Sequence, residues 1–255
     1  MILGGWNRGL SHSTNVILMR WSEERRGLHY SPRTEICKGQ RLSPSTEFKP
    51  GEPPWNKRGK FIPNLRPSVS LAYILGVLYG DGWTSGTNGR YQVGLSVVDR
   101  VFADEFARAL QCIGVRPVRL KTKARGNRQE QVTVVGCNRY LYHWIQNRTL
   151  KDLEFTALKD LENASAFLRG FYDSDGSCAR ERYFNFTNTD ESLIHLAWRL
   201  LSRLGIVARI LGPYSNGPWK PFWRLNIPAS SGGRFVEVVG PTIKRGLLGG
   251  GASCE

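Results

Sequence analysis

The sequence of 255 residues lacks an apolar run of the roughly 18 residues needed to span a bilayer. Its start, MILGGWNRGLSHS, lacks the charged beginning and long apolar centre of a signal peptide. The four histidines form no HxxxH or HNH-like cluster, and no CxxC spacing suggests zinc. Because the cysteines are odd in number and scattered, we expect reduced thiols in a cytosolic protein; they are Cys37, Cys112, Cys137, Cys178 and Cys254.

Acidic residues are also scarce relative to basic ones. Lys and Arg number 36 against 21 Asp and Glu, which gives a formal net charge of +15. An excess of this size indicates a polyanionic partner, most often nucleic acid. A ribosomal or membrane-surface protein would share the charge. Such a protein would not explain Asp81 and Asp175, two acids that each follow an apolar helical segment.

Residues 1–67 differ from the rest and are assigned as a basic N-terminal extension. They hold 12 basic and 5 acidic residues and show little sustained periodicity. Prolines in the segment 43–61 forbid a helix there, and Trp55 lies beside Lys57 and Arg58. Such a basic arm can lie along phosphates and stack on bases. A solvated linker explains the composition equally well, so both interpretations stay open.

The remainder of the chain repeats itself. YILGVLYGDGW (73–83) and FLRGFYDSDGS (167–177) lie 94 positions apart, and each is an apolar helical segment that ends in Asp-Gly. Alternating segments that follow each motif predict strands. The next helices, 99–115 and 190–206, are only 91 positions apart, which predicts a longer turn in the first repeat at 85–89.

A third helix closes each repeat, near 138–147 and 232–240. Each unit of about 90 residues therefore has the order α-β-β-α-β-β-α, an α+β fold built on an antiparallel sheet. The predicted domains are two repeats, 68–160 and 161–246, and a flexible tail, 247–255.

Polar and apolar residues alternate along the predicted strands, so each sheet has one polar face. Arg, Lys, Gln and Asn side chains read base edges and hold phosphates, and a two-stranded ribbon fits the major groove. An ordinary wet sheet face is the alternative, but four cations on one strand favour nucleic-acid binding. The candidate DNA-binding residues are Arg90, Gln92, Ser96, Arg119, Lys121, Lys123, Arg125, Gln129, Gln131, Thr133, Asn185, Thr187, Arg224 and Asn226, with Lys57 and Arg58 of the extension.

Small residues at i and i+4 would let the two motif helices touch: Gly76, Gly80, Gly170 and Ser174. In that arrangement Asp81 and Asp175 emerge side by side, where the helix dipoles and their mutual repulsion disfavour two charges. Mg²⁺ suits this place, because it takes oxygen ligands and bridges phosphates. Two metal-bound acids near a pseudo-dyad can each serve one strand of a duplex. Simple helix-ending turns are the alternative, which the presence of two matching pairs disfavours.

LGVLYGDG (75–82) and LRGFYDSDG (168–176) resemble the two signature motifs of single-chain LAGLIDADG homing endonucleases. The resemblance covers roughly residues 67–246. It implies a monomeric, Mg²⁺- or Mn²⁺-dependent enzyme of intron homing that hydrolyses one phosphodiester per strand of a specific double-stranded DNA site and leaves 3′ overhangs. It also implies that Asp81 and Asp175 are the catalytic metal ligands, joined by the carbonyls of Gly80 and Ser174. Asp173 lies on another helical face and is not assigned to the metal.

Active sites of this family usually add polar or basic residues, which makes Asn188, Arg139 and Arg234 ancillary candidates. The first repeat has Val97 and Val98 where the second has Asn188 and Thr189, and valine cannot take such a role. RNA maturases and non-cleaving regulators of the same fold often lose a motif acid, whereas this chain keeps both. Intron RNA stays open as a partner. The Met start and the GASCE end differ from an intein, so we expect a freestanding or intron-encoded intracellular protein.

Overall fold

The computed structural model describes residues 15–27, 51, 61–87, 89–122, 129–179, 183–215 and 217–244. Its contacts divide the chain into two units, Met1–Gly59 and Lys60–Glu255. The first unit contains helix α1 (Val16–Glu24). Asn15 is the N-cap of this helix, and its side chain accepts hydrogen bonds from two backbone N–H groups. No residue of α1 is buried. The low periodicity of residues 1–67 gave no prediction of this helix.

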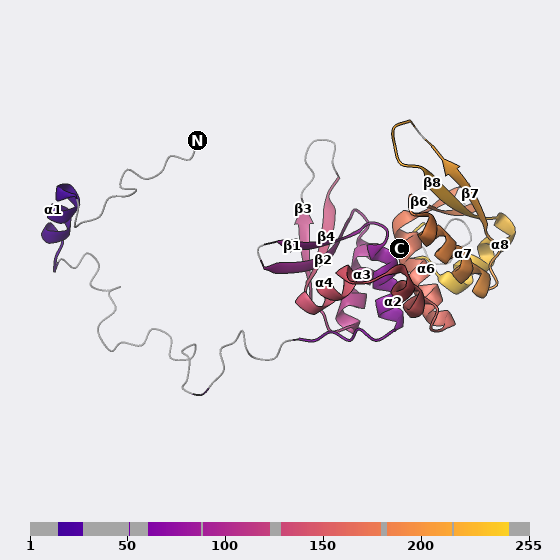
Figure 1. Ribbon diagram of the computed structural model, residues 1–255, viewed down its shortest axis with the longest axis horizontal. Helices are drawn as coiled ribbons and strands as arrows, with labels where there is room; N and C mark the ends of the chain where they lie inside the picture. The colour runs from indigo at the N-terminus through magenta and orange to yellow at the C-terminus, as the bar shows by residue number, and fades with distance from the viewer. Residues whose placement is uncertain are drawn as a thin grey trace, which may run out of the picture. The chain divides into compact units, whose positions relative to one another are not determined.

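In the second unit the first repeat has the expected order α-β-β-α-β-β-α (Figure 1). Its four strands form an antiparallel sheet in the order β1-β2-β4-β3. The elements are α2 (Val69–Leu78), β1 (Gly82–Thr87), β2 (Arg90–Val97), α3 (Arg100–Cys112), β3 (Pro117–Thr122), β4 (Gln131–Cys137) and α4 (Arg139–Gln146).

The second repeat has the same order, with an antiparallel sheet arranged β5-β6-β8-β7. The prediction of an α+β fold with two pseudo-symmetric repeats is therefore confirmed. Its elements are α6 (Leu161–Asp175), β5 (Gly176–Ala179), β6 (Tyr183–Asn188), α7 (Glu191–Arg203), β7 (Arg209–Tyr214), β8 (Phe222–Ile227) and α8 (Ala229–Val239).

The first hairpin of the two repeats differs in strand length. β1 and β2 have 6 and 8 residues, whereas β5 and β6 have 4 and 6. Only residues 88 and 89 separate β1 from β2, while residues 180–182 separate β5 from β6. The prediction of a longer turn at 85–89 is wrong: the extra residues lengthen the paired strands. Gly89, with a φ of 73°, adopts the left-handed conformation that so short a connection favours.

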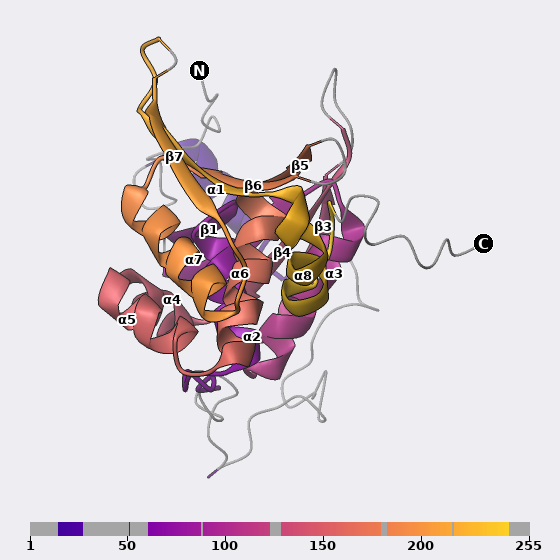
Figure 2. The ribbon, with the colours of Figure 1, turned by 90° about the vertical axis from the view of Figure 1, so that its right-hand side faces the viewer.

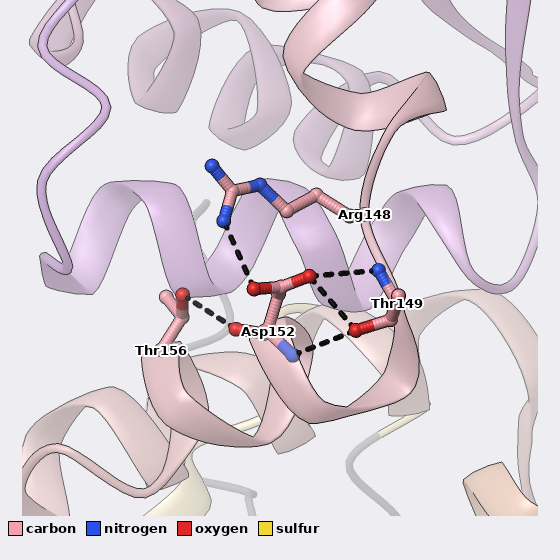
Figure 3. Close-up of polar contacts among 4 residues, drawn as sticks. All are labelled: Arg148, Thr149, Asp152 and Thr156. Carbon is pink, nitrogen blue, oxygen red and sulfur yellow. Dashed lines mark hydrogen bonds and ion pairs between the residues drawn. The ribbon is translucent and has the colours of Figure 1, made fainter.

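Helix α5 (Leu150–Ala157) joins the repeats and was not predicted. The Thr149 hydroxyl accepts a hydrogen bond from the Asp152 backbone N–H at 3.4 Å, and the Asp152 carboxylate accepts one from the Thr149 N–H at 2.9 Å (Figure 3). Arg148 donates to the other carboxylate oxygen at 3.2 Å. The stretch T-L-K-D is thus a capping box, and it was the available sequence signal for this helix.

The two motif helices, α2 and α6, pack against each other at the centre of the unit, as predicted (Figure 2). A Cβ added at Gly76 would lie 2.2 Å from the carbonyl oxygen of Phe167, and one at Gly170 would lie 2.3 Å from that of Tyr73. No larger side chain fits between the backbones at either place. The contact therefore depends on glycine and fixes where both helices end.

Helices cover one face of each sheet, as Figure 2 shows for the sheet of β6 and β7, and the opposite face turns away from them. In the first sheet the covered face carries the buried side chains of Val93, Leu95 and Val134. In the second sheet aromatic side chains dominate that face, with Phe184 and Phe186 packed on Tyr172, Phe171 and Phe235. Burial of such apolar side chains contributes about 1.5–3 kcal/mol each.

Candidate active site and nucleic-acid interface

Asp81 and Asp175 lie together at the ends of the two central helices. Asp175 is the last residue of α6, whereas Asp81 follows the end of α2 by three residues. A Cβ added at Gly80 would lie 2.3 Å from the Ser174 Cβ and 3.4 Å from the Asp175 Cγ. The absence of a side chain at Gly80 therefore brings the turn that carries Asp81 against the end of α6.

The two carboxylates have unequal surroundings: Asp81 is exposed and Asp175 is half-buried. Burial raises the pKa of Asp175 to about 6, the nearby charge of Asp81 adds to the increase, and a hydrogen bond from Asn188 opposes it. Asn188 donates that bond from Nδ2 to Oδ2 of Asp175 at 2.5 Å. The Asn188 Oδ1 accepts from the Asp190 backbone N–H at 2.7 Å, which fixes the orientation of the amide. Asn188 is therefore beside one acid, as an ancillary candidate should be.

The equivalent position in the first repeat is Val97. Gly82 pairs with Leu95 in the first sheet, and Gly176 pairs with Phe186 in the second. Two residues further along, the second strand reaches Val97 in one repeat and Asn188 in the other. We call Asp81, Asp175 and the groups around them the two-carboxylate centre. Its two halves are chemically different, because the side chain of Val97 can donate no hydrogen bond.

Lys244 is a third charged group at the centre, and the sequence analysis missed it. Its Nζ donates to the backbone carbonyls of Asp173 and Ser174, at 3.0 Å each. Lys244 as a whole is exposed, but its two Nζ contacts are partly buried, and desolvation lowers the pKa of Lys244. Four acidic charges oppose that change: Asp81, Asp173, Asp175 and Asp99. No local pattern could identify Lys244, because the contact joins residues about 70 positions apart.

Asp173 holds the segment that carries Lys244. The buried Asp173 carboxylate accepts from the backbone N–H groups of Thr242 at 2.8 Å and Ile243 at 3.2 Å, and from the Tyr73 hydroxyl at 3.4 Å. Burial raises the pKa of Asp173, and the hydrogen bonds from residues 242 and 243 limit that increase. Asp173 therefore anchors this segment on a different face of α6 from Asp175.

The structure does not bring Arg139 or Arg234 to the two acids. Arg139 stacks on the Tyr91 ring at 5.4 Å, near the hairpin end of β2 and four residues from Leu95. Arg234 lines a cavity with Leu161 and Glu162 in the first turn of α6, about 20 Å along the helix from its last residue. The expectation that these two arginines join the acids is corrected: Arg139 begins α4 and Arg234 lies in the middle of α8, and both contact residues away from the ends of α2 and α6.

In the second sheet the candidate DNA-binding residues share one face. Asn185 pairs with Asn226 and Thr187 with Arg224, so all four side chains point away from Phe184, Phe186 and Leu225. Asn226 donates from Nδ2 to Asn185 Oδ1 at 3.0 Å, and Arg224 stacks on the Tyr214 ring at 5.8 Å. Arg209 pairs with Asn226 and joins this face, although it was not predicted.

The first sheet differs from the prediction at β3. Arg119 pairs with Val134 and Lys121 with Val132, so both cations share the face of buried valines and not the open face. Arg119 forms an ion pair of 3.0 Å with Asp104 of α3. The open face of β3 carries Val118, Leu120 and Thr122 instead. The prediction that the cations of β3 lie on the open face is wrong. Arg119 and Lys121 do share one face, but it is the helix-side face, which is exposed to solvent because β3 is an edge strand.

The remaining candidates of the first sheet occupy its open face. Ser96 and Thr133 pair there and share a hydrogen bond of 3.0 Å, and Trp83 Nε1 donates to the Ser96 hydroxyl at 3.3 Å. Arg90, Gln92 and Gln131 have the same strand phase, and Gln129 lies just before β4. Lys57, Arg58, Lys123 and Arg125 lie outside the described residues.

The donor atoms at the centre fit a hard divalent cation. Among the residues that the structure describes, no group of three His, Cys, Asp or Glu side chains could hold a metal. The centre offers the carboxylates of Asp81 and Asp175 and the adjacent backbone carbonyls of Gly80 and Ser174. Mg²⁺ accepts such partial protein coordination when water and substrate phosphates supply the other ligands. The raised pKa of Asp175, about 6 and caused first by burial, also fits a place that a cation would stabilise.

Comparison with known proteins identifies the family. Residues 68–144 and 162–240 match the model of a LAGLIDADG-like domain. The chain therefore belongs to the LAGLIDADG family, and each match begins at the N-terminus of one of the two motif helices.

Two relatives are uncharacterized proteins of Methanocaldococcus jannaschii. One is 34% identical over 151 residues, which cover 56% of this chain and 57% of the relative. The other is 33% identical over 235 residues, covering 84% of this chain and 83% of the relative. This chain thus matches little more than half of the first relative's length.

Solved structures share the fold. A structure of mesophilic variants of the homing endonuclease I-DmoI has a TM-score of 0.51 and 22% identity, covering 71% of this chain and 97% of that chain. I-DmoI in complex with DNA and Mn has a TM-score of 0.51 and 20% identity, covering 67% and 95%. Full-length DUF199/WhiA from Thermatoga maritima has a TM-score of 0.50 and 13% identity, covering 71% and 58%. Within the described residues, no helix is long and apolar enough to cross a membrane.

Proposed function

We propose that this protein is a monomeric, sequence-specific, double-strand DNA endonuclease of the homing type. The observation that carries the proposal is the meeting of Asp81 and Asp175 at the ends of two packed helices, between two pseudo-symmetric sheets. One acid per repeat matches the two strands of a duplex. The structures of I-DmoI in complex with DNA and Mn or Ca support a DNA substrate and a divalent ion.

The open faces of the two sheets would hold the duplex on either side of the acids. Arg224 and Asn226 present a guanidinium and an amide, which are groups that hold phosphates or read base edges in the major groove. A net charge of +15 would steer the protein to the phosphate backbone. The first sheet offers hydroxyl and apolar side chains near its centre, so the two half-sites would be read by different chemistry.

The residues of the centre have distinct roles in this proposal. Asp81 and Asp175, with the carbonyls of Gly80 and Ser174, would hold divalent ions, Mg²⁺ or Mn²⁺. A bound ion supplies activation of water and stabilisation of the leaving oxygen in an in-line displacement at phosphorus. Asn188 orients the Asp175 carboxylate and favours its ionised form. Asp173 holds the Lys244 segment against the end of α6.

Cleavage of one bond per strand across the minor groove would leave 3′ overhangs. The first experiment incubates the purified protein with a randomised duplex library and Mg²⁺, and then sequences the cut ends. Recovery of one long, weakly palindromic site with 3′ overhangs is the expected result. Tight binding without cutting, in Mg²⁺ and in Mn²⁺, would contradict an endonuclease.

The carboxylate variants then test the assignment of the site. We expect Asp81→Asn and Asp175→Asn to abolish double-strand cleavage of the recovered site while binding to it stays largely intact, because the asparagines keep the size of the side chains. Full cleavage by either variant would remove that residue from the metal site.

A second function, an RNA maturase or a non-cleaving regulator that uses the same fold, would need no metal-bound acids. DUF199/WhiA shares the fold at 13% identity. Retention of both motif acids favours the endonuclease. Affinity for structured intron RNA, compared with duplex DNA at equal salt, distinguishes the maturase from the nuclease.

A further inference from the structure

The Lys244 ammonium group is placed unusually for a lysine. It does not form an ion pair on the surface but donates to two successive backbone carbonyls, of Asp173 and Ser174, where α6 ends. The carbonyls at the end of a helix carry partial negative charge, and Asp81 and Asp175 add two full charges nearby. A cation at this place neutralises part of that charge.

The protein holds Lys244 there with several contacts. Asp173 accepts hydrogen bonds from residues 242 and 243, and the Lys244 carbonyl accepts one from the Tyr172 hydroxyl at 3.2 Å. The backbone of Lys244 has a φ of 59°, in the left-handed region that side chains other than glycine adopt at a cost. These contacts maintain a strained backbone, which indicates that the position of the ammonium group matters.

We propose that Lys244 is a resident cation of the two-carboxylate centre, and that it competes with a divalent ion for the Ser174 carbonyl. This inference rests on the proposed function only in taking Asp81, Asp175 and that carbonyl as metal ligands. A divalent ion that uses the Ser174 carbonyl must displace the ammonium group from it. The competition acts on the Asp175 side, so the two halves of the centre bind metal unequally.

The test measures Mn²⁺ binding without DNA, from the electron paramagnetic resonance signal of free Mn²⁺. The variants are Lys244→Met, which removes the charge, and Lys244→Gln, which keeps an N–H donor without the charge. Removal of a positive charge at close range should tighten Mn²⁺ binding about tenfold in both variants. Lys159→Met is the matched control, because Lys159 also donates to a backbone carbonyl, that of Pro67 at 3.0 Å, but at the opposite end of α2.

Thermal unfolding gives a second measurement. In EDTA, Lys244→Met and Lys244→Gln should unfold at a lower temperature than the parent protein, since the two carboxylates lose their counter-charge. Saturating Mn²⁺ should raise the unfolding temperature of both variants more than that of the parent or of Lys159→Met. Should Lys244→Met fail to fold, Lys244→Gln provides both readouts.

Unchanged or weaker Mn²⁺ binding by the Lys244 variants would overturn the proposal, as would equal effects of Lys159→Met. The proposed function fails separately. A protein that cuts no duplex, yet binds Mn²⁺ more tightly after loss of Lys244, supports the resident cation and contradicts the nuclease. If the parent protein cuts duplex DNA but the Lys244 variants bind Mn²⁺ with unchanged affinity, the nuclease is supported and the resident cation is contradicted.

Discussion

Asn188 holds the carboxylate of Asp175 through a hydrogen bond of 2.5 Å, and the position equivalent to Asn188 in the first repeat is Val97. The pseudo-symmetry of the fold is therefore broken at the centre. One acid is half-buried with an amide partner, and the other is exposed beside an aliphatic strand end. Under the proposed function, the two strands of the duplex would be cut with different dependence on these neighbours.

Asn188→Ala should slow cleavage of one strand selectively. Without the amide, the pKa of Asp175 rises above its present value of about 6, which burial sets first, and fewer molecules hold it ionised at neutral pH. A hydrogen bond to a charged group is worth about 1.5–3 kcal/mol, so the rate for that strand should fall roughly 10- to 100-fold. The measurement uses a duplex with a different label on each strand.

The second strand of the same duplex is the internal control for that experiment. It should be nicked at nearly the parent rate, so nicked product accumulates. If both strands slow equally, Asn188 would act on binding or folding and not on one acid.

The raised pKa of Asp175 also predicts a pH dependence of stability in EDTA. A carboxyl group with a higher pKa in the folded than in the unfolded protein binds more protons when folded, so stability falls as pH rises. Burial is the main cause here, and the window lies between the ordinary value of 3.8 and about 6. Asp175→Asn should therefore stabilise the protein at pH 7 by about 1–2 kcal/mol after allowance for solvent screening.

Chemical denaturation of Asp175→Asn and the parent protein at pH 4 and pH 7 measures this difference. The stabilisation should be fully present at pH 7 and much smaller at pH 4, because the folded parent is then protonated at Asp175 and the unfolded chain is close to its own pKa of 3.8. Asp81→Asn, at the exposed acid, serves as the comparison and should change stability less. A constant difference across this range would show that burial of the charge is not its cause.

The fold could be predicted from the sequence because the two repeats show in patterns of residues that are close together in the chain. The Asp-Gly motifs, the helix spacing and the alternation along the strands each report on neighbours in the chain. The same patterns made Asp81 and Asp175 the candidates for a metal site, whereas Asn188 became a candidate only through the resemblance to the family. Helix α5 was missed although Thr149 and Asp152 form a capping box.

Lys244 and the orientation of Arg119 could not be predicted in this way. Lys244 reaches the centre because Asp173 binds the backbone of residues 242 and 243, a contact across about 70 positions. Alternation showed that Arg119 and Lys121 share a face of β3, but only the pairing with Val134 and Val132 shows which face it is. Register between strands is a long-range property, and the apolar residues of β3, Val118 and Leu120, lie on the open face, so alternation alone indicates the wrong face for the cations.

The contact between α2 and α6 makes a separate prediction about stability. Gly76→Ala and Gly170→Ala would each place a Cβ 2.2–2.3 Å from a backbone carbonyl oxygen, so the helices must separate. We expect each variant to lose about 3 kcal/mol or more of unfolding free energy, since overpacked cores cost about 1–3 kcal/mol even where side chains can yield. Urea denaturation followed by circular dichroism measures the loss.

Gly233→Ala is the matched control for helical glycine. Gly233 lies within α8, and a Cβ added there would meet nothing within 4 Å. This substitution should stabilise the protein by about 0.5–1 kcal/mol through helix propensity alone. Stability of Gly76→Ala equal to that of Gly233→Ala would contradict close packing of the motif helices.

The open faces of the sheets predict which arginines contact DNA. Arg224 points away from the helices and stacks on Tyr214, whereas Arg119 lies on the helix side of its sheet and pairs with Asp104. Arg224→Ala should weaken binding to the target duplex and lower the slope of log affinity against log salt by about 1, as loss of one phosphate contact does. Alternatively, if Arg224 reads a base, the variant loses discrimination at one position while the salt slope stays.

Arg119→Ala removes the same charge from the edge strand β3, on the helix side of its sheet, and is the control. Its ion pair is exposed, so its loss should change stability by no more than about 1 kcal/mol. The affinity and the salt slope of this variant should stay close to those of the parent protein, because the guanidinium group faces α3. Titrations of a fluorescent duplex at several salt concentrations compare the two variants directly. A larger effect of Arg119→Ala than of Arg224→Ala would mean that the duplex lies against the edge of the first sheet and not across the open faces.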